Sequence, residues 1–140
     1  MIPKTSYAIK MIDQLFQDIS EDIYLRINQI DNIDKFDLTK VEKGILSIHA
    51  RWSEQSVIHG KSILRLINNS EIKDFEIIII DIDRISSQKQ IELIGTVSQG
   101  YFESVWIENG RIEFNYRDNK KSIELIKFKN YLNEKINKSQ

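Results

Sequence analysis

The stretch I-L-S-I-H-A-R-W-S-E-Q-S, residues 45–56, decides the fold. Its first part is apolar, and residues 45–52 are predicted to form a strand. A helix is predicted to follow directly, from Ser53 or Glu54 to Asn68, because apolar residues recur there at helical spacing. A strand that leads into a helix is the first half of a β-α-β unit, whose second strand lies parallel to the first. The stretch therefore indicates an α/β fold.

The next segment supplies the second strand of this unit. Residues 75–83, F-E-I-I-I-I-D-I-D, form a short and nearly continuous apolar run. Such a run is typical of a central strand that is covered on both faces. A short helix is predicted from Ser86 or Ser87 to Ile94, and Gly95 is expected to end it.

A β-hairpin and a last helix complete the predicted order. Strands are expected at 101–107 and 111–116, and Asn109-Gly110 between them is the preferred pair for a type I′ turn. The last helix is predicted over 120–136. Its apolar positions are Ile123, Ile126, Phe128 and Leu132. The order after Gly44 is therefore β-α-β-α-β-β-α, with the hairpin added antiparallel to the same mixed sheet.

The first 43 residues have a different pattern. A helix is predicted over 4–20 because apolar residues recur every three or four positions. For 21–30 a continued helix is favoured, and an edge strand is the open alternative because residues 23–28 alternate between apolar and polar. A sustained apolar stripe has to be buried, so the N-terminal helix is expected to cover the sheet or to form a homodimer.

The composition excludes several classes of protein. The 140 residues fit one domain, 1–140, and 41% hydrophobic with 29% charged residues is ordinary globular composition. The formal net charge of −1 shows no basic excess for nucleic acid. The absence of cysteine excludes disulfides, thiolate nucleophiles and cysteine metal sites. The longest apolar run, Ile77–Ile80, is far below the roughly 20 residues of a membrane span, and no signal peptide is visible, so a cytoplasmic protein is expected.

These elements and their motifs resemble the thioredoxin fold. Thioredoxins have an aromatic-Ala-x-Trp-Cys-Gly-Pro-Cys motif, an Asn-x-Asp motif at the end of the next strand and a Lys-Asn-Gly hairpin turn. The matching segments are A-R-W-S-E-Q-S (50–56), I-I-I-D-I-D (78–83) and V-W-I-E-N-G-R (105–111). The resemblance covers 44–136 and implies a three-layer fold, a central mixed sheet flanked by helices, with 1–43 as an N-terminal helical extension.

The redox apparatus of thioredoxins is absent from the sequence. Ser53 and Ser56 stand where the family has its two cysteines, and Ser47 stands at the place of its proton-relaying acid. Residues 101–103 replace the segment with the family's cis-proline, and a trans turn is expected because a cis bond without proline costs about 3 kcal/mol. Thiol–disulfide exchange needs a thiolate, so redox activity is excluded.

Ser53 is the remaining candidate for catalysis. Glutathione transferases, which share the thioredoxin fold, use a serine at this helix N-terminus to hold a substrate thiolate. Serine is also a common N-cap residue, and the adjacent Glu54 would repel an anion. We therefore expect a capping role, no enzyme activity and no cofactor.

The sequence gives little support for a metal site or a hydrolase. His49 is expected in or beside the core, and His59 follows on the next helix. A metal ion would need both to converge with Asp81 or Asp83, which are instead expected to cap the following turn and helix. Serine, histidine and aspartate are present, but the G-x-S-x-G motif of hydrolases is not.

Aromatic residues near the segment 53–56 suggest a binding surface. Trp52 precedes this segment, Tyr101 and Phe102 are expected across from it, and only one of Val105 and Trp106 is expected to face the core. Some of these aromatic residues are expected to be core instead. The predicted binding residues are Trp52, Ser53, Glu54, Gln55, Tyr101, Phe102 and Glu103.

The resemblance implies a non-catalytic thioredoxin-like protein that binds another protein. Cysteine-less members of the superfamily include hydrogenase-maturation chaperones and adaptor domains, which implies a chaperone or assembly role. A toxin-neutralising immunity protein is a second version, because small, cysteine-free, single-domain chains fit that role too. A glutathione-transferase-like enzyme that uses Ser53 is the alternative class.

Overall fold

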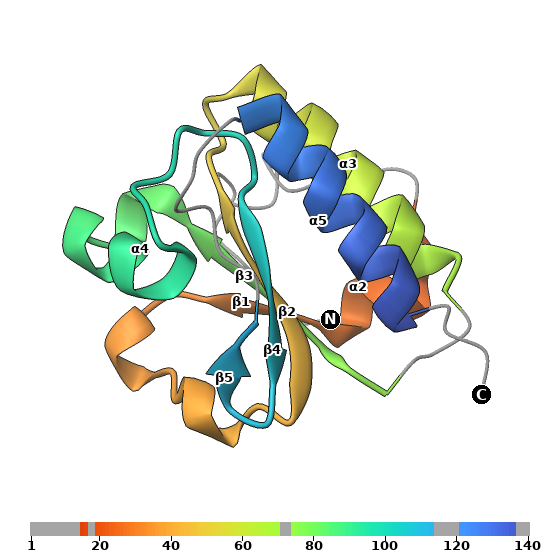
Figure 1. Cartoon of the computed structure of the whole chain (residues 1–140), viewed down its shortest axis with the longest axis horizontal. Coiled ribbons are helices and arrows are strands. Elements are labelled where there is room, and N and C mark those ends of the chain that lie inside the picture. Colours follow the sequence, from red (N-terminus) through yellow and green to blue (C-terminus); the bar gives the residue numbers. More distant parts are fainter. Residues whose placement is uncertain (1–14, 17–18, 71–73, 114–120, 137–140) are drawn as a thin grey trace.

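The computed structural model describes residues 15–16, 19–70, 74–113 and 121–136. For residues 121–127 it describes the backbone alone. These residues form a mixed α/β fold around a five-stranded sheet of order β1-β3-β2-β4-β5 (Figure 1). The strands are β1 (Ile27–Ile30), β2 (Lys43–His49), β3 (Glu76–Asp81), β4 (Ser104–Glu108) and β5 (Arg111–Ile112). The α-helices are α2 (Glu21–Arg26), α3 (Glu54–Asn68), α4 (Ser87–Ile94) and α5 (Lys121–Ile136). Three short 3-10 helices are η1 (Ile33–Lys35), η2 (Leu38–Lys40) and η3 (Ile82–Arg84).

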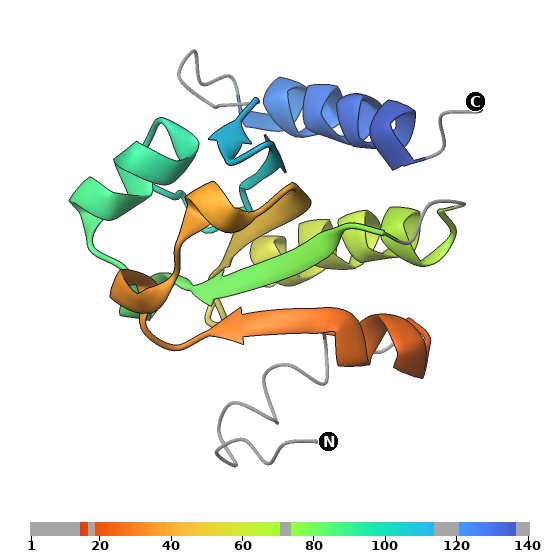
Figure 2. The same ribbon diagram turned by 90° about the horizontal axis from the view of Figure 1, so that it is seen from below.

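The sheet has the mixed pairing that the sequence predicts. β2 and β3 are parallel and joined by α3, and their register runs from Gly44 opposite Glu76 to His49 opposite Asp81. β1 adds a third parallel strand beyond β3, as Figure 2 shows. β4 lies antiparallel to β2, and β5 lies antiparallel to β4. The predicted parallel pair and the antiparallel hairpin in one sheet are both confirmed.

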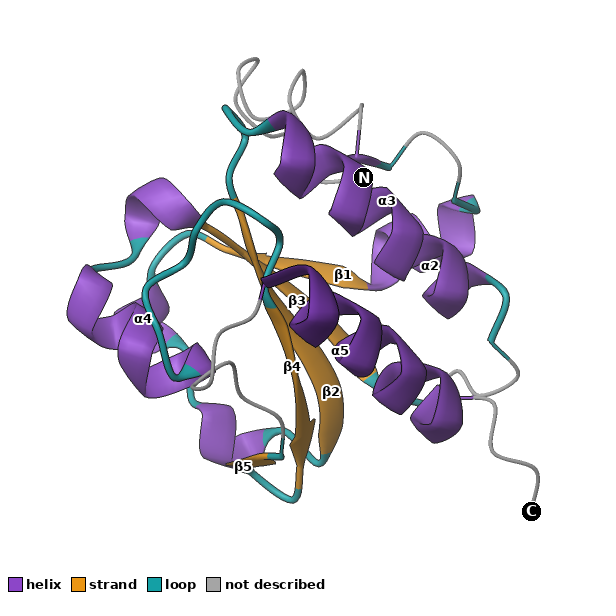
Figure 3. Ribbon diagram, turned by 45° about the horizontal axis from the view of Figure 1, so that its top comes forward, coloured by secondary structure: helices purple, strands orange, loops and turns teal. Residues whose placement is uncertain are grey.

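Both faces of the sheet are covered by helices (Figures 1 and 3). The face toward α3 and α5 buries Ile77, Ile79 and Trp106. The face toward α4 buries side chains from the alternate strand positions, among them Ile78 and Val105. The expectation that only one of Val105 and Trp106 faces the core is therefore wrong, because successive side chains on a strand point to opposite faces and here both faces are core.

The structure tests only part of what the sequence predicts for residues 4–30. Most of the helix predicted over 4–20 lies outside the described residues, but Leu15 is buried in the core beside α3. The continued helix predicted over 21–30 is correct only to Arg26, because the chain then pairs with β3 as the edge strand β1. The Ser20 side chain accepts a hydrogen bond from the Ile23 amide at 3.3 Å, so α2 begins with a cap of its own.

All four strands predicted after Gly44 have other bounds in the structure, and a turn and a capping side chain end the first two. The strand predicted over 45–52 ends at His49, where a turn closes as the Ser53 amide donates to the Ala50 carbonyl at 3.0 Å. The strand predicted over 75–83 ends at Asp81, which caps η3. The strands predicted over 101–107 and 111–116 are described as Ser104–Glu108 and Arg111–Ile112, and the latter prediction extends outside the described residues.

The predicted turn and helix ends agree with the structure. Asn109 and Gly110 both have positive φ, 53° and 75°, as a type I′ turn requires. Gly95 ends α4 with a φ of 84°, and Ser86 caps its start. α5 starts at Lys121, and Phe128 and Leu132 from its predicted apolar positions are fully buried. None of the helices within the described ranges has the length and apolar character that crossing a bilayer demands.

Candidate functional site

The predicted binding residues gather where the chain leaves the carboxyl end of β2. Here the turn at 50–52 leads into α3, and the loop between α4 and β4, residues 95–103, lies against it. In α/β sheets this end of the parallel strands is where ligand sites usually form. Its side chains divide into an exposed set and a buried set.

Trp52 dominates the exposed set. Its side chain is 64% exposed, the largest fraction among the described large hydrophobic residues. Its ring lies against Gly100, where an added Cβ would be 3.1 Å from Trp52 Cη2. Gly100 also has a φ of +79°, so glycine is favoured there for both space and conformation. The ring therefore packs against Gly100 and leaves most of its surface exposed to solvent.

Ser53 is the N-cap of α3, as predicted. Its Oγ accepts a hydrogen bond from the Ser56 amide at 3.2 Å and donates one to the Gly100 carbonyl at 2.6 Å. The hydroxyl hydrogen is therefore already engaged and would have to leave the carbonyl to reach a substrate thiolate. Glu54 and Gln55 follow in the first turn, and both are exposed.

Tyr101 is half-buried beside the start of α3. Its carbonyl contacts His59 Nδ1 at 3.1 Å, and the two rings lie 5.8 Å apart between centroids. His59, which the sequence reasoning considered only as a metal ligand, therefore belongs to the same face. We use the name Trp52 surface for Trp52, Ser53, Glu54, Gln55, His59 and Tyr101.

Phe102 and Glu103 are buried, so they are not part of this exposed face. Phe102 is 1% exposed and packs edge-on against His49, with 5.6 Å between ring centroids. Gly60 gives it room, since a Cβ there would stand 2.9 Å from the Phe102 ring and would also meet Leu15. Glu103 is 5% exposed and bonds to its own loop. No peptide bond in the described chain is cis, so the expected trans turn at 101–103 is confirmed.

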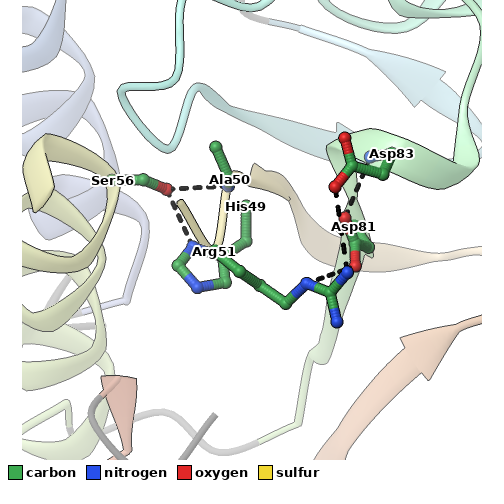
Figure 4. A network of polar contacts seen from close by, with 6 residues as sticks. All are labelled: His49, Ala50, Arg51, Ser56, Asp81 and Asp83. Carbon is green, nitrogen blue, oxygen red and sulfur yellow. Dashed lines mark hydrogen bonds and ion pairs between the residues drawn. The ribbon is translucent and has the colours of Figure 1, made fainter. Parts of the chain in front are cut away.

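A buried serine–histidine pair lies beneath the exposed set (Figure 4). Ser56 Oγ is 2.8 Å from His49 Nδ1 and accepts a hydrogen bond from the Ala50 amide at 3.0 Å. Ser56 is fully buried, and His49 is 2% exposed, which agrees with its predicted place in the core. Burial, and then the charge of Arg51, lower the pKa of His49 to about 4. The imidazole is therefore neutral at pH 7, and the pair is closed to a substrate from solvent.

Arg51 and the two aspartates connect the ends of β2 and β3, as Figure 4 shows. Arg51 Nε lies 2.8 Å from Asp81 Oδ2, and Arg51 Nη2 lies 3.8 Å from Asp83 Oδ2. Asp81 also accepts from the Asp83 amide at 2.9 Å, which is the capping role predicted for it. Sequence reasoning assigned no role to Arg51 or to buried Ser56. The role of Ser56 depends on how the end of β2 packs under the first turn of α3, and that of Arg51 on the neighbouring end of β3.

Other site types are not apparent in the described part of the chain. No three His, Asp or Glu side chains there gather as a metal ion would require.

An open cavity of about 430 Å³ lies at the opposite, amino end of β2 and β3. It is lined by Glu42, Lys43, Asp74, Phe75 and Glu76. This cavity contains none of the predicted binding residues.

Comparison with known proteins gives no family for this chain. No protein-family model matches the sequence, and no curated protein matches it.

Proposed function

We propose that the chain is a cysteine-less, non-redox thioredoxin-like protein. Support comes from the β2-α3-β3 unit, which is parallel, and from the β4-β5 hairpin, which joins the same sheet antiparallel. Further support comes from α5, whose buried residues join those of α3 on one face of the sheet while α4 covers the other, as in the three-layer fold that the resemblance implies. Ser53 and Ser56 occupy the two cysteine positions of that fold, one as a helix cap and one as a buried partner of His49.

Its proposed activity is to bind another protein through the Trp52 surface. The observation that carries this proposal is the 64% exposure of Trp52 at the sheet end, on a base formed by Gly100. Tryptophan and tyrosine are enriched among residues that dominate binding energy, since a large ring buries much area and loses little side-chain entropy. Most of the apolar area of the Trp52 ring is therefore still available for burial by a partner.

Binding is favoured over the glutathione-transferase-like alternative by the contacts of Ser53. Its hydroxyl hydrogen bonds to the Gly100 carbonyl, and its lone pair accepts from the Ser56 amide. Both partners of the hydroxyl are backbone groups, which supports a capping role. We therefore propose a binding protein in which Ser53 has a structural role and not a catalytic one.

Site-specific photo-crosslinking in cells that make the native protein tests the proposal. A photoreactive phenylalanine replaces Trp52 in one variant and Ile91 in the control, because Ile91 is also exposed, at 49%, but lies on α4. We expect a discrete crosslinked protein from position 52 and none from position 91. Equal crosslinking at both positions, or none at position 52, would reject the proposal.

The captured protein also separates the two versions of the binding role. A metalloenzyme subunit or another assembly client would identify a chaperone or adaptor. A toxin would identify an immunity protein. With the purified partner, Trp52→Ala is expected to raise Kd by about thirtyfold or more, which corresponds to the roughly 2 kcal/mol of a binding hot spot.

A further inference from the structure

The loop of residues 95–103 has an unusual backbone for a segment without regular structure. Gly95, Gly100 and Phe102 have positive φ values of 84°, 79° and 59°. For a bulky residue such as Phe102 this conformation is disfavoured and needs support from its surroundings. The loop must therefore be held by specific contacts.

The carboxylate of Glu103 supplies these contacts. One oxygen accepts from Ser98 Oγ at 2.6 Å and from the Tyr101 amide at 3.3 Å. The other accepts from the Gln99 amide at 2.6 Å. Ser98 Oγ in turn accepts from the Gly100 amide at 3.2 Å. Hydrogen bonds to an ionised acceptor are short and strong, so one buried carboxylate organises four consecutive residues of the loop.

The loop is also hydrogen-bonded to three neighbouring elements, β2, α4 and the start of α3. The Ile48 amide of β2 donates to the Glu103 carbonyl at 3.0 Å. Gln90 of α4 accepts from the Ser98 amide at 2.8 Å. Ser53, at the start of α3, donates to the Gly100 carbonyl at 2.6 Å. The loop thus has a fixed place beneath the indole of Trp52.

We infer that Glu103 is a positioning residue that holds Gly100 in place against Trp52 and Tyr101 in place against His59. The inference rests on the proposed function in one respect, that the surface so formed is the one that meets the partner. Glu103, which the sequence analysis placed among the contact residues, then acts from inside the protein. A surface formed before binding does not have to be ordered at the encounter, and this favours affinity.

The two tryptophans allow a direct test by ¹⁹F NMR of the 5-fluorotryptophan-labelled protein. Trp52 is exposed and Trp106 is 2% exposed, so the two should give separate resonances, which W52F and W106F assign. Glu103→Gln keeps the shape but turns an amide group toward backbone N–H donors. We expect the Trp52 resonance to broaden or split while the Trp106 resonance keeps its position. An unchanged Trp52 resonance in folded E103Q would overturn the inference.

Two further variants control for folding and for charge. If E103Q unfolds, the Trp106 resonance moves too, and Ser98→Ala then carries the test. This variant removes the bond from Ser98 to Glu103, together with the bond that Ser98 Oγ accepts from the Gly100 amide, and keeps the carboxylate. Broadening of Trp52 alone in S98A supports the inference, and an unchanged Trp52 resonance overturns it. Glu92→Gln, an exposed residue of α4, should leave both resonances unchanged.

Crosslinking from position 52 separates this inference from the proposed function. A changed Trp52 resonance in E103Q, with no partner captured by the position-52 crosslinking variant that keeps Glu103, would leave the positioning role intact and reject the binding function. Capture that is equally efficient with and without E103Q, together with an unchanged Trp52 resonance, would keep the binding function and reject the positioning role.

Discussion

The buried and the exposed side chains at the carboxyl end of β2 differ in what they contribute. His49, Ser56, Phe102 and Glu103 are each at most 5% exposed, and their partners are other parts of the same chain. Trp52, Glu54 and Gln55 lie within a few residues of this set and face solvent. The carboxyl end of β2 is therefore divided between an inner layer, whose contacts lie within the chain, and an outer layer that is open to solvent.

This division predicts that stability and binding can be changed separately. Substitutions in the inner layer should lower the free energy of unfolding, and substitutions in the outer layer should leave it almost unchanged. Four measurements test this contrast.

The largest loss of stability is expected from Phe102→Ala. Phe102 fills the space that Gly60 leaves on α3 and contacts the ring of His49, so its removal creates a cavity in the core. Removal of a buried phenylalanine ring costs about 3–5 kcal/mol. Urea unfolding followed by circular dichroism measures the loss. A loss below about 1 kcal/mol would place Phe102 outside the core and contradict the division.

The next effect is a pH dependence that arises from His49. Burial lowers its pKa in the folded state to about 4, against 6.5 for an unperturbed histidine. The unfolded chain therefore binds a proton more readily than the folded one between these pH values, and stability falls as pH is lowered through that range. The full difference corresponds to about 3 kcal/mol. Unfolding of the wild type and of His49→Gln at pH 7 and pH 4.5 should show a smaller pH-dependent loss in the variant.

A smaller loss is expected from Ser56→Ala, with Ser53→Ala as its matched comparison. Loss of Ser56 Oγ leaves both the Ala50 amide and His49 Nδ1 without this partner in a buried place, which costs about 1–3 kcal/mol. Ser53→Ala removes a helix cap, which costs about 1 kcal/mol. The melting temperature of S56A should therefore be lower than that of S53A, and the reverse order would mean that Ser53 and Ser56 do not belong to an outer and an inner layer as described.

The smallest effect on stability is expected from Trp52→Ala. An exposed side chain outside the core changes the free energy of unfolding by no more than about 0.5 kcal/mol. The same variant is expected to lose most of its affinity for the crosslinked partner. A large loss of stability in W52A would show that the indole holds the Gly100 loop, and the outer layer would then not be separable from the inner one.

Local sequence features predicted the type of most helices, strands and turns. They did not predict which residues at the carboxyl end of β2 are buried and which are exposed. The apolar run of β3, the Asn109-Gly110 turn and the Ser86 and Gly95 helix ends depend on nearby residues, so their type could be predicted from the sequence. The inward position of Phe102 depends on the missing side chain of Gly60, 42 residues away in the chain. The role of Glu103 depends on backbone amides that a loop presents only once it is folded. Trp52 could be predicted as a surface residue because it stands beside the predicted cap Ser53.

The edge strand β1 has a consequence for how the chain can be divided. Residues 1–43 include Ile27–Ile30, which pair with β3, and Leu15, whose side chain reaches Gly60 of α3. A chain cut before Gly44 would expose the hydrogen-bonding edge of β3, with its row of isoleucines, to other molecules. Uncovered hydrophobic edges of this kind recruit strands from neighbouring chains. The N-terminal part is therefore expected to act as a built-in protection against aggregation rather than as a removable addition.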